Sequence, residues 1–190
     1  MCPKLVIKPN KNHRISCTVH RVPKKMTFRK AEIKDLDRIN EIHNQAILEK
    51  FKVADLVPWT KEKRLKQFEE RNNEEYPVYV VEIDNFVVGF AILNPYRPGR
   101  TALKQTAEIS YFVDKNYREK GIGKQLMDDM ESVCIELGIK TLFGIIIDTN
   151  DASIKLVEKC GYEKWGHLPN VAQFDDVEVG HVYYGKRIKT

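Results

Sequence analysis

The sequence lacks a long hydrophobic run, a cysteine pattern and, over its first 25 residues, any acidic side chain. No apolar stretch approaches the roughly 18 residues that cross a membrane, and no apolar segment near residue 1 is typical of a signal peptide. We therefore expect no membrane partner. The cysteines have no metal-ligand spacing, so we expect no bound metal, reduced thiols and a cytoplasmic protein; they are Cys2, Cys17, Cys134 and Cys160.

The net charge of +5 is concentrated at the N-terminus. Residues 1–25 contain seven of the 32 Lys and Arg, which leaves 25 bases against all 27 acids in residues 26–190. We interpret residues 1–25 as a basic arm and residues 26–190 as a single domain. Because the excess of bases is confined to the arm, a broad nucleic-acid-binding surface is not expected. A targeting or nucleic-acid function of the arm itself stays open.

Residues 26–190 alternate between strand-like and helix-like patterns. Leu36, Ile39 and Ile42 recur every three residues, as on the buried face of a helix, and Asp35 and Thr60 are expected to cap two helices. In chain order we predict a strand at 26–29, helices at 36–47 and 60–72, strands at 77–83 and 86–93 joined by an Asp84–Asn85 hairpin turn, a strand at 106–113, a helix at 121–137, a strand at 142–147, a helix at 151–159, and strands at 162–167 and 177–187. The class is α/β, with helices on both faces of a mixed sheet.

A basic, glycine-rich turn follows the apolar strand at 109–113 and opens the helix at 121–137. Its sequence is Arg118-Glu119-Lys120-Gly121-Ile122-Gly123-Lys124. Glycine lets the backbone approach a ligand closely, and the free N–H groups of a first helical turn favour an anion. The turn therefore predicts a phosphate site, although a nucleotide pocket or a simple tight turn would use the same residues.

Three further passages, together with the order of the elements, make a family resemblance specific. The spacing Arg-x-x-Gly-x-Gly at 118–123 resembles the acetyl-coenzyme A signature of the GCN5-related N-acetyltransferase (GNAT) superfamily, and residues 150–156 with Gly161-Tyr162 resemble its second coenzyme A motif. Thr106-Ala107-Glu108-Ile109-Ser110 and Pro58-Trp59-Thr60 are similar to the phosphinothricin/methionine sulfoximine branch. The likeness covers about residues 26–186 and implies the GNAT fold, a largely antiparallel mixed sheet splayed at the cofactor site.

The resemblance implies acetyl-CoA as co-substrate and assigns residues to it. The backbone of the strand end would pair with the pantetheine arm; these residues are Tyr111, Phe112 and Val113. The amides of the turn would hold the pyrophosphate with the Arg118 side chain; they belong to Lys120, Gly121, Ile122, Gly123 and Lys124. Asn150 would bind the pantetheine with Ser153 nearby, although Asn150 at this spacing is equally typical of a helix N-cap.

Acetyl transfer to an amine needs a general base, since primary amines are mostly protonated at neutral pH. The resemblance gives this function to Glu108. The strand period places Glu108 with Ser110 and Phe112 on the face away from Ile109. Burial would raise the pKa of this carboxyl and improve it as a base; the alternative is an ordinary strand glutamate in an ion pair.

The acceptor is less well defined by the sequence. Arg97 and Arg100 lie in the loop before the Glu108 strand, and Arg100 matches an arginine of the branch that suits a carboxylate. Phe51 and Trp59 are candidates to wall the acceptor pocket, and packing in the aromatic core is the alternative for both. Val157 stands where the family often has a tyrosine or histidine as general acid. Leu103 likewise replaces a frequent tyrosine, which leaves the acid and the acceptor undefined.

We therefore predict an N-acetyltransferase that acts on the primary amine of a small amino acid or analogue. Two alternatives stay open: a peptide or protein amine as acceptor, and a non-catalytic acyl-CoA sensor. The resemblance also implies a homodimer.

Overall fold

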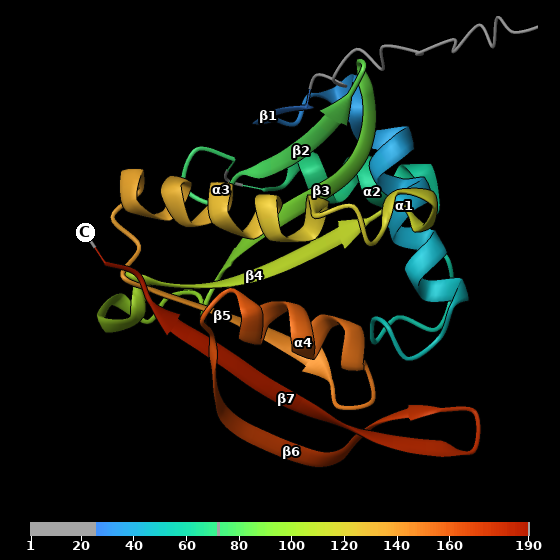
Figure 1. Cartoon of the computed structure of the whole chain (residues 1–190), viewed down its shortest axis with the longest axis vertical. Helices are drawn as coiled ribbons and strands as arrows, with labels where there is room; N and C mark the ends of the chain where they lie inside the picture. Colours follow the sequence, from blue (N-terminus) through green and yellow to red (C-terminus); the bar gives the residue numbers. More distant parts are fainter. Residues whose placement is uncertain (1–25, 72, 190) are drawn as a thin grey trace, which may run out of the picture.

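The computed structural model describes residues 26–71 and 73–189 (Figure 1). The predicted basic arm, residues 1–25, lies outside the described residues. Within the described part, no helix is long and apolar enough to cross a membrane. The elements follow the predicted order: β1 (Met26–Lys30), α1 (Leu36–Leu48), α2 (Lys61–Glu69), β2 (Val78–Ile83), β3 (Phe86–Pro95), β4 (Thr106–Val113), α3 (Ile122–Glu136), β5 (Thr141–Ile147), α4 (Asp151–Lys159), β6 (Glu163–Phe174) and β7 (Val177–Arg187).

The strands form one seven-stranded sheet in the order β1-β2-β3-β4-β5-β7-β6. All neighbours are antiparallel except β4 and β5, which pair in parallel over only three residues, from Thr106–Thr141 to Glu108–Phe143. Beyond Glu108 the two strands diverge, as the ribbon shows (Figure 1). This mixed sheet, splayed at its centre, confirms the predicted fold class.

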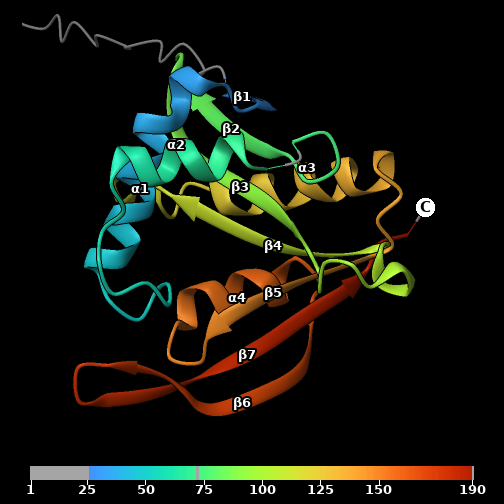
Figure 2. The same ribbon diagram turned by 180° about the vertical axis from the view of Figure 1, so that it is seen from behind.

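Helices cover both faces of the sheet (Figures 1 and 2). On one face, α1 packs Ile39 and Ile42 against the buried strand residues Val80 and Phe90. On the other face, Leu126 and Met130 of α3, one helical turn apart, belong to the largest cluster, together with side chains of α4 and β5. The helical period therefore decides which side chains enter each of the two cores.

Turn and cap residues behave largely as predicted. Asp84 and Asn85 form the hairpin turn with φ of 54° and 64°, in the left-handed region that a two-residue hairpin needs. The Thr60 hydroxyl caps α2 by accepting a hydrogen bond from Lys63 N at 3.2 Å. Asp35 occupies the predicted N-cap position of α1, but its side chain makes no capping hydrogen bond: its carboxylate accepts instead from the backbone N–H of Glu32 and from the Arg29 guanidinium.

Two predicted boundaries also need correction. Helix α2 ends at Glu69 rather than near residue 72, and Arg71 donates to the carbonyl oxygens of Tyr76 and Leu93. Strand β6 extends to Phe174, well beyond the predicted end at residue 167. It is an edge strand whose side chains are mostly exposed on both faces, and its register with β7 shifts twice. Such a strand has no alternating pattern for sequence analysis to detect.

Candidate functional site

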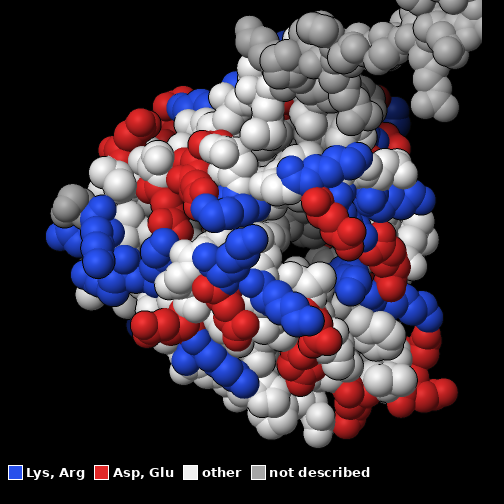
Figure 3. Space-filling view, in the orientation of Figure 1, with Lys and Arg blue, Asp and Glu red and all other residues white. Residues whose placement is uncertain are grey.

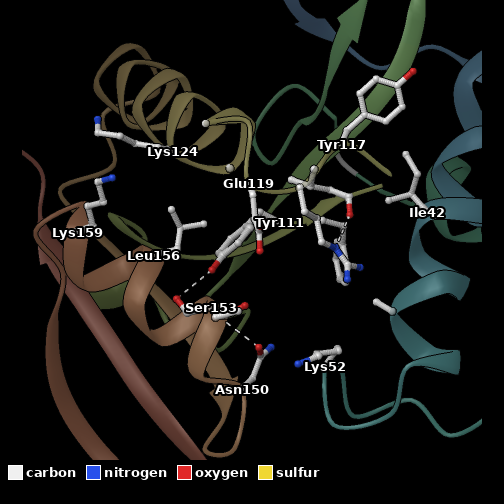
Figure 4. Close-up of a pocket in the computed structure, with 17 residues that line it drawn as sticks. Ile42, Lys52, Tyr111, Tyr117, Glu119, Lys124, Asn150, Ser153, Leu156 and Lys159 are labelled. Carbon is white, nitrogen blue, oxygen red and sulfur yellow. Dashed lines mark hydrogen bonds between the residues drawn. The ribbon is translucent and has the colours of Figure 1, made fainter. Parts of the chain in front are cut away.

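Two cavities meet where β4 and β5 diverge. The first has a volume of about 460 Å³ and is enclosed by α1, the end of β4, the turn at 117–124 and α4 (Figure 4). We call it the basic cavity, because its charged residues are Lys52, Arg118, Lys124 and Lys159 against one acid, Glu119. The second has a volume of about 230 Å³ and is bounded by residues 52–54, β4, β5 and β7. We call it the Glu108 cavity.

Nine of the eleven residues predicted to bind the cofactor line the basic cavity: Tyr111, Phe112, Val113, Arg118, Gly121, Gly123, Lys124, Asn150 and Ser153. The other two point elsewhere. Lys120 donates a hydrogen bond of 2.7 Å to the Asn116 carbonyl, and the Ile122 side chain is buried in the core. Their backbone amides still belong to the turn that opens α3, so the predicted contact through these amides stays a prediction.

The glycine-rich turn is shaped by two glycines and one buried carboxylate. Gly121 caps α3 with φ of 80°, a conformation that glycine adopts without strain. A Cβ at Gly123 would lie 2.8 Å from Leu156 Cδ2, so a larger residue at this position would require the Leu156 side chain to move. Asp114, only 1% exposed, accepts hydrogen bonds from Asn116 N at 2.7 Å and from Gln45. The first N–H groups of α3 are thereby held beside the basic cavity.

The positive charge of the cavity lies at its rim (Figure 3). Arg118 makes a 2.7 Å ion pair with Glu49, and its Nε donates to the Val113 carbonyl at 3.3 Å. Lys124 pairs with Asp128, one helical turn further along α3. Four bases against one acid, next to a helix N-terminus, create a field that suits a polyanionic ligand such as a nucleotide diphosphate.

Tyr111 and Asn150 lie at the back of the basic cavity (Figure 4). The Asn150 side chain accepts a hydrogen bond from Ser153 N at 3.4 Å and therefore caps α4, as one of the two predicted functions requires. The Tyr111 hydroxyl donates to the Ser153 carbonyl at 3.4 Å. Burial raises the pKa of Tyr111 to about 12, so this residue stays a neutral hydrogen-bond donor at neutral pH.

Glu108 lines the second cavity without a partner. Among the described residues its carboxylate makes no hydrogen bond or ion pair, and burial raises its pKa above the ordinary value. The side chain is on the face away from Ile109, as predicted: Ile109 joins the α3 core, whereas Phe112 stacks on Phe90 in the α1 core. An unpaired carboxyl whose pKa is raised is a stronger base than an ordinary glutamate.

Residues 50–59, which we call the strap, link α1 to α2. Its residues 52–54 line the Glu108 cavity, and Lys52 also lines the basic cavity. One end is fixed by Phe51, which packs on Phe174 at 4.8 Å, and by a 2.5 Å ion pair between Lys50 and Asp175. Trp59 fixes the other end, since its backbone N–H donates to the Asn44 side chain at 2.8 Å. Phe51 and Trp59, predicted to wall the acceptor pocket, thus anchor the strap and line neither cavity.

The two predicted acceptor-binding arginines lie apart from Glu108. Arg97 and Arg100 line a third cavity, of about 270 Å³, formed by the loop before β4 together with Tyr76. This cavity shares no lining residue with the basic cavity or the Glu108 cavity. The structure does not place Arg97 and Arg100 in the cavity of Glu108, and their binding of the acceptor stays a prediction.

Two side chains that the sequence did not single out line the Glu108 cavity. Lys52 comes from the strap and His181 from β7, where it lies opposite Ile147. Burial lowers the pKa of His181, against the opposing effect of Asp148, so its imidazole is neutral at neutral pH. Neither residue belongs to a sequence motif. They line the same cavity only because the strap and β7 both lie beside it in the folded chain.

Val157, the α4 residue at the position where the family often has a general acid, lies in the core. Val157 is 1% exposed and packs in the α3 core, so this position faces away from both cavities. Within the described residues, no group of three or more His, Cys, Asp or Glu side chains is arranged to hold a metal ion.

The splayed sheet, the glycine turn at the start of α3 and the two joined cavities define an acyl-CoA-dependent transferase. The model of the Acetyltransferase (GNAT) family matches residues 41–162, and the chain belongs to this family. It is thus a GNAT acetyltransferase, and GNAT enzymes use acetyl-CoA.

Comparison with known proteins shows which members of the GNAT family this chain resembles. The chain is 37% identical over 150 residues to YwnH of Bacillus subtilis (strain 168), a candidate phosphinothricin acetyltransferase, covering 79% of this chain and 91% of that protein. It is 29% identical over 148 residues to the L-methionine sulfoximine/L-methionine sulfone acetyltransferase of Pseudomonas aeruginosa, covering 77% and 86%. Among solved structures, yncA of Salmonella typhimurium with acetyl-CoA is similar, with a TM-score of 0.80, 26% identity and coverage of 86% and 94%.

Proposed function

We propose that this enzyme transfers the acetyl group of acetyl-CoA to the primary amine of a small amino acid or analogue, with Glu108 as general base. The observation that carries the proposal is the unpaired, half-buried Glu108 carboxylate in a cavity that joins the basic cavity. At about 230 Å³ the Glu108 cavity is smaller than the 300–1,000 Å³ usual for drug-sized ligands, which favours a small acceptor. The relatives named for methionine sulfoximine and phosphinothricin support the same class of acceptor.

The residues of the basic cavity fit acetyl-CoA, which supplies an activated acyl thioester. The N–H groups at the start of α3, with Arg118 and Lys124, would hold its phosphates. Beyond Glu108, β4 has lost β5 as a partner while still pairing with β3, so one edge of residues 111–113 can pair with the pantetheine arm. A backbone N–H of Phe112 or Val113 on this edge would stabilise the charge that develops on the thioester oxygen.

Glu108 accepts the proton that the acceptor amine must lose to become a nucleophile. Its raised pKa suits this step, because a base works best when its pKa is near the working pH. The departing thiol has a pKa near 8.5 and leaves without strong acid assistance, in keeping with the valine at position 157. A homodimer and a cytoplasmic location stay predictions from the sequence.

The proposal is tested by measuring thiol release from acetyl-CoA with a panel of amino acids, amines and peptides. We expect turnover with amino acids and a roughly 10²- to 10⁴-fold lower kcat in Glu108→Gln, with unchanged acetyl-CoA affinity by calorimetry. Glu163→Gln, which removes an exposed carboxylate from β6, is the control and should retain full activity. Turnover confined to peptides would favour the protein-amine alternative, and binding of acetyl-CoA without turnover of any amine would favour the sensor.

A further inference from the structure

The residues common to the two cavities mark the place where cofactor and acceptor meet. Five residues line both the basic cavity and the Glu108 cavity: Lys52, Tyr111, Phe112, Asn150 and Ser153. Lys52 is the one charged side chain among them. Its ammonium extends from the strap toward Asn150, which also lines both cavities (Figure 4).

Lys52 is held in place by its neighbours while its own charge stays unpaired. Lys50 and Phe51 fix the strap to the β6–β7 turn, through Asp175 and Phe174 respectively. The Lys52 ammonium, by contrast, makes no hydrogen bond or ion pair with any described residue. Its stem is carried by a backbone segment anchored at both ends, so the charge is kept beside the junction.

Among the described residues, the Glu108 cavity contains no other permanent cation. Its remaining titratable side chains are Glu108, Tyr111 and His181, and the last two are neutral at neutral pH. The other walls are largely aliphatic and come from Val53, Ala54, Ile145 and Ile147. An acceptor that arrives as a bare ammonium ion is repelled by Lys52, whereas one that also carries a carboxylate gains a charge-assisted hydrogen bond.

We propose that Lys52 binds the carboxylate of the acceptor and thereby selects amines that carry a carboxylate next to the amine and a small aliphatic side chain. The proposal rests on the proposed function and deepens it. It assigns carboxylate recognition to the strap, not to Arg97 and Arg100, which line a separate cavity. Glu108 then serves the amine, Lys52 serves the carboxylate, and the aliphatic walls receive the side chain.

The test compares an amino acid with its own carboxamide, for example leucine with leucinamide. These acceptors share the amine and side chain and differ in the negative charge that Lys52 would bind. Wild-type enzyme should prefer leucine in kcat/KM. Lys52→Gln should lower kcat/KM for leucine by about 10- to 100-fold, while kcat/KM for leucinamide changes by less than about threefold. Lys52→Glu should reverse the preference.

Lys164→Gln is the matched control, because it removes the same charge from an exposed position on β6 that lines neither cavity. We expect it to keep the leucine preference of the wild type. Since Lys52 also lines the basic cavity, the acetyl-CoA affinity of each variant is measured by calorimetry. A Lys52→Gln enzyme that binds acetyl-CoA weakly but discriminates normally would overturn the proposal.

Two other results would also contradict it. If Arg97→Gln/Arg100→Gln abolishes the leucine preference while Lys52→Gln leaves it intact, the carboxylate is bound by the arginines. If Lys52→Gln lowers kcat/KM equally for both acceptors, its role is not carboxylate recognition. Absence of turnover of either compound by the wild-type enzyme is a different outcome, because it overturns the proposed function itself and the assignment of Lys52 with it.

Discussion

Gly123 lies against Leu156 so closely that a Cβ at position 123 would stand 2.8 Å from Leu156 Cδ2. Gly123 is in the first turn of α3 and Leu156 is on α4, and both line the basic cavity. The second glycine of the turn therefore does more than free the backbone for a ligand. It permits the close approach of the two helices that enclose the basic cavity.

We expect Gly123→Ala to push Leu156 or the start of α3 aside and to weaken acetyl-CoA binding by about tenfold or more, with a loss of about 1–3 kcal/mol in stability from overpacking. Calorimetry and urea unfolding measure the two effects. In Gly123→Ala/Leu156→Ala the clash is removed, so affinity should recover relative to Gly123→Ala. Gly166→Ala is the control, because nothing lies within 4 Å of a Cβ there. Equal losses in the single and double variants would contradict the steric explanation.

Glu108→Gln should make the protein more stable at neutral pH while it removes activity. Burial raises the pKa of Glu108 in the folded state, so the folded chain holds the proton more tightly than the unfolded chain does. The charged carboxylate therefore costs stability as the pH rises through this raised pKa, and the cost is absent below the unfolded value of about 4.3. Unfolding free energies of both proteins at pH 8, 6 and 4.5 should converge toward acid pH. A variant less stable at every pH would show that the carboxylate has a partner.

His43 should make stability fall between pH 6.5 and about 4. It is 5% exposed, lies between the rings of Trp59 and Phe112 at 5.1 and 5.0 Å, and has its pKa lowered to about 4 by burial and then by Arg64. In the unfolded chain this histidine binds a proton at about pH 6.5, whereas in the folded chain it stays neutral until about pH 4. The free energy of unfolding therefore falls by up to about 3 kcal/mol as the pH is lowered through this range. His43→Gln should flatten urea unfolding free energies over this range. An unchanged pH dependence would mean that His43 is protonated in the folded state.

Periodic and turn-forming residues made the fold predictable. The spacing of Leu36, Ile39 and Ile42 located α1, and the pair Asp84–Asn85 located the β2–β3 hairpin, because local sequence decides both. The end of β6 was missed because an exposed edge strand carries no burial pattern. Asp35 stands at the predicted N-cap position of α1, but its side chain does not cap the helix because Arg29, from another element, binds the same carboxylate.

The sequence by itself determined the α/β class, the order of the elements, the glycine turn before α3 and the presence of Glu108 on a strand beside it. These features depend on residue types at short spacings, where the backbone period fixes the result. Only the tertiary structure decided which side chains share a cavity: it separated Arg97 and Arg100 from Glu108 and brought in Lys52 and His181. The physical reason is that β4 and β5 diverge after three paired residues, and the walls of the gap come from segments as far apart in sequence as residues 52–54 and His181.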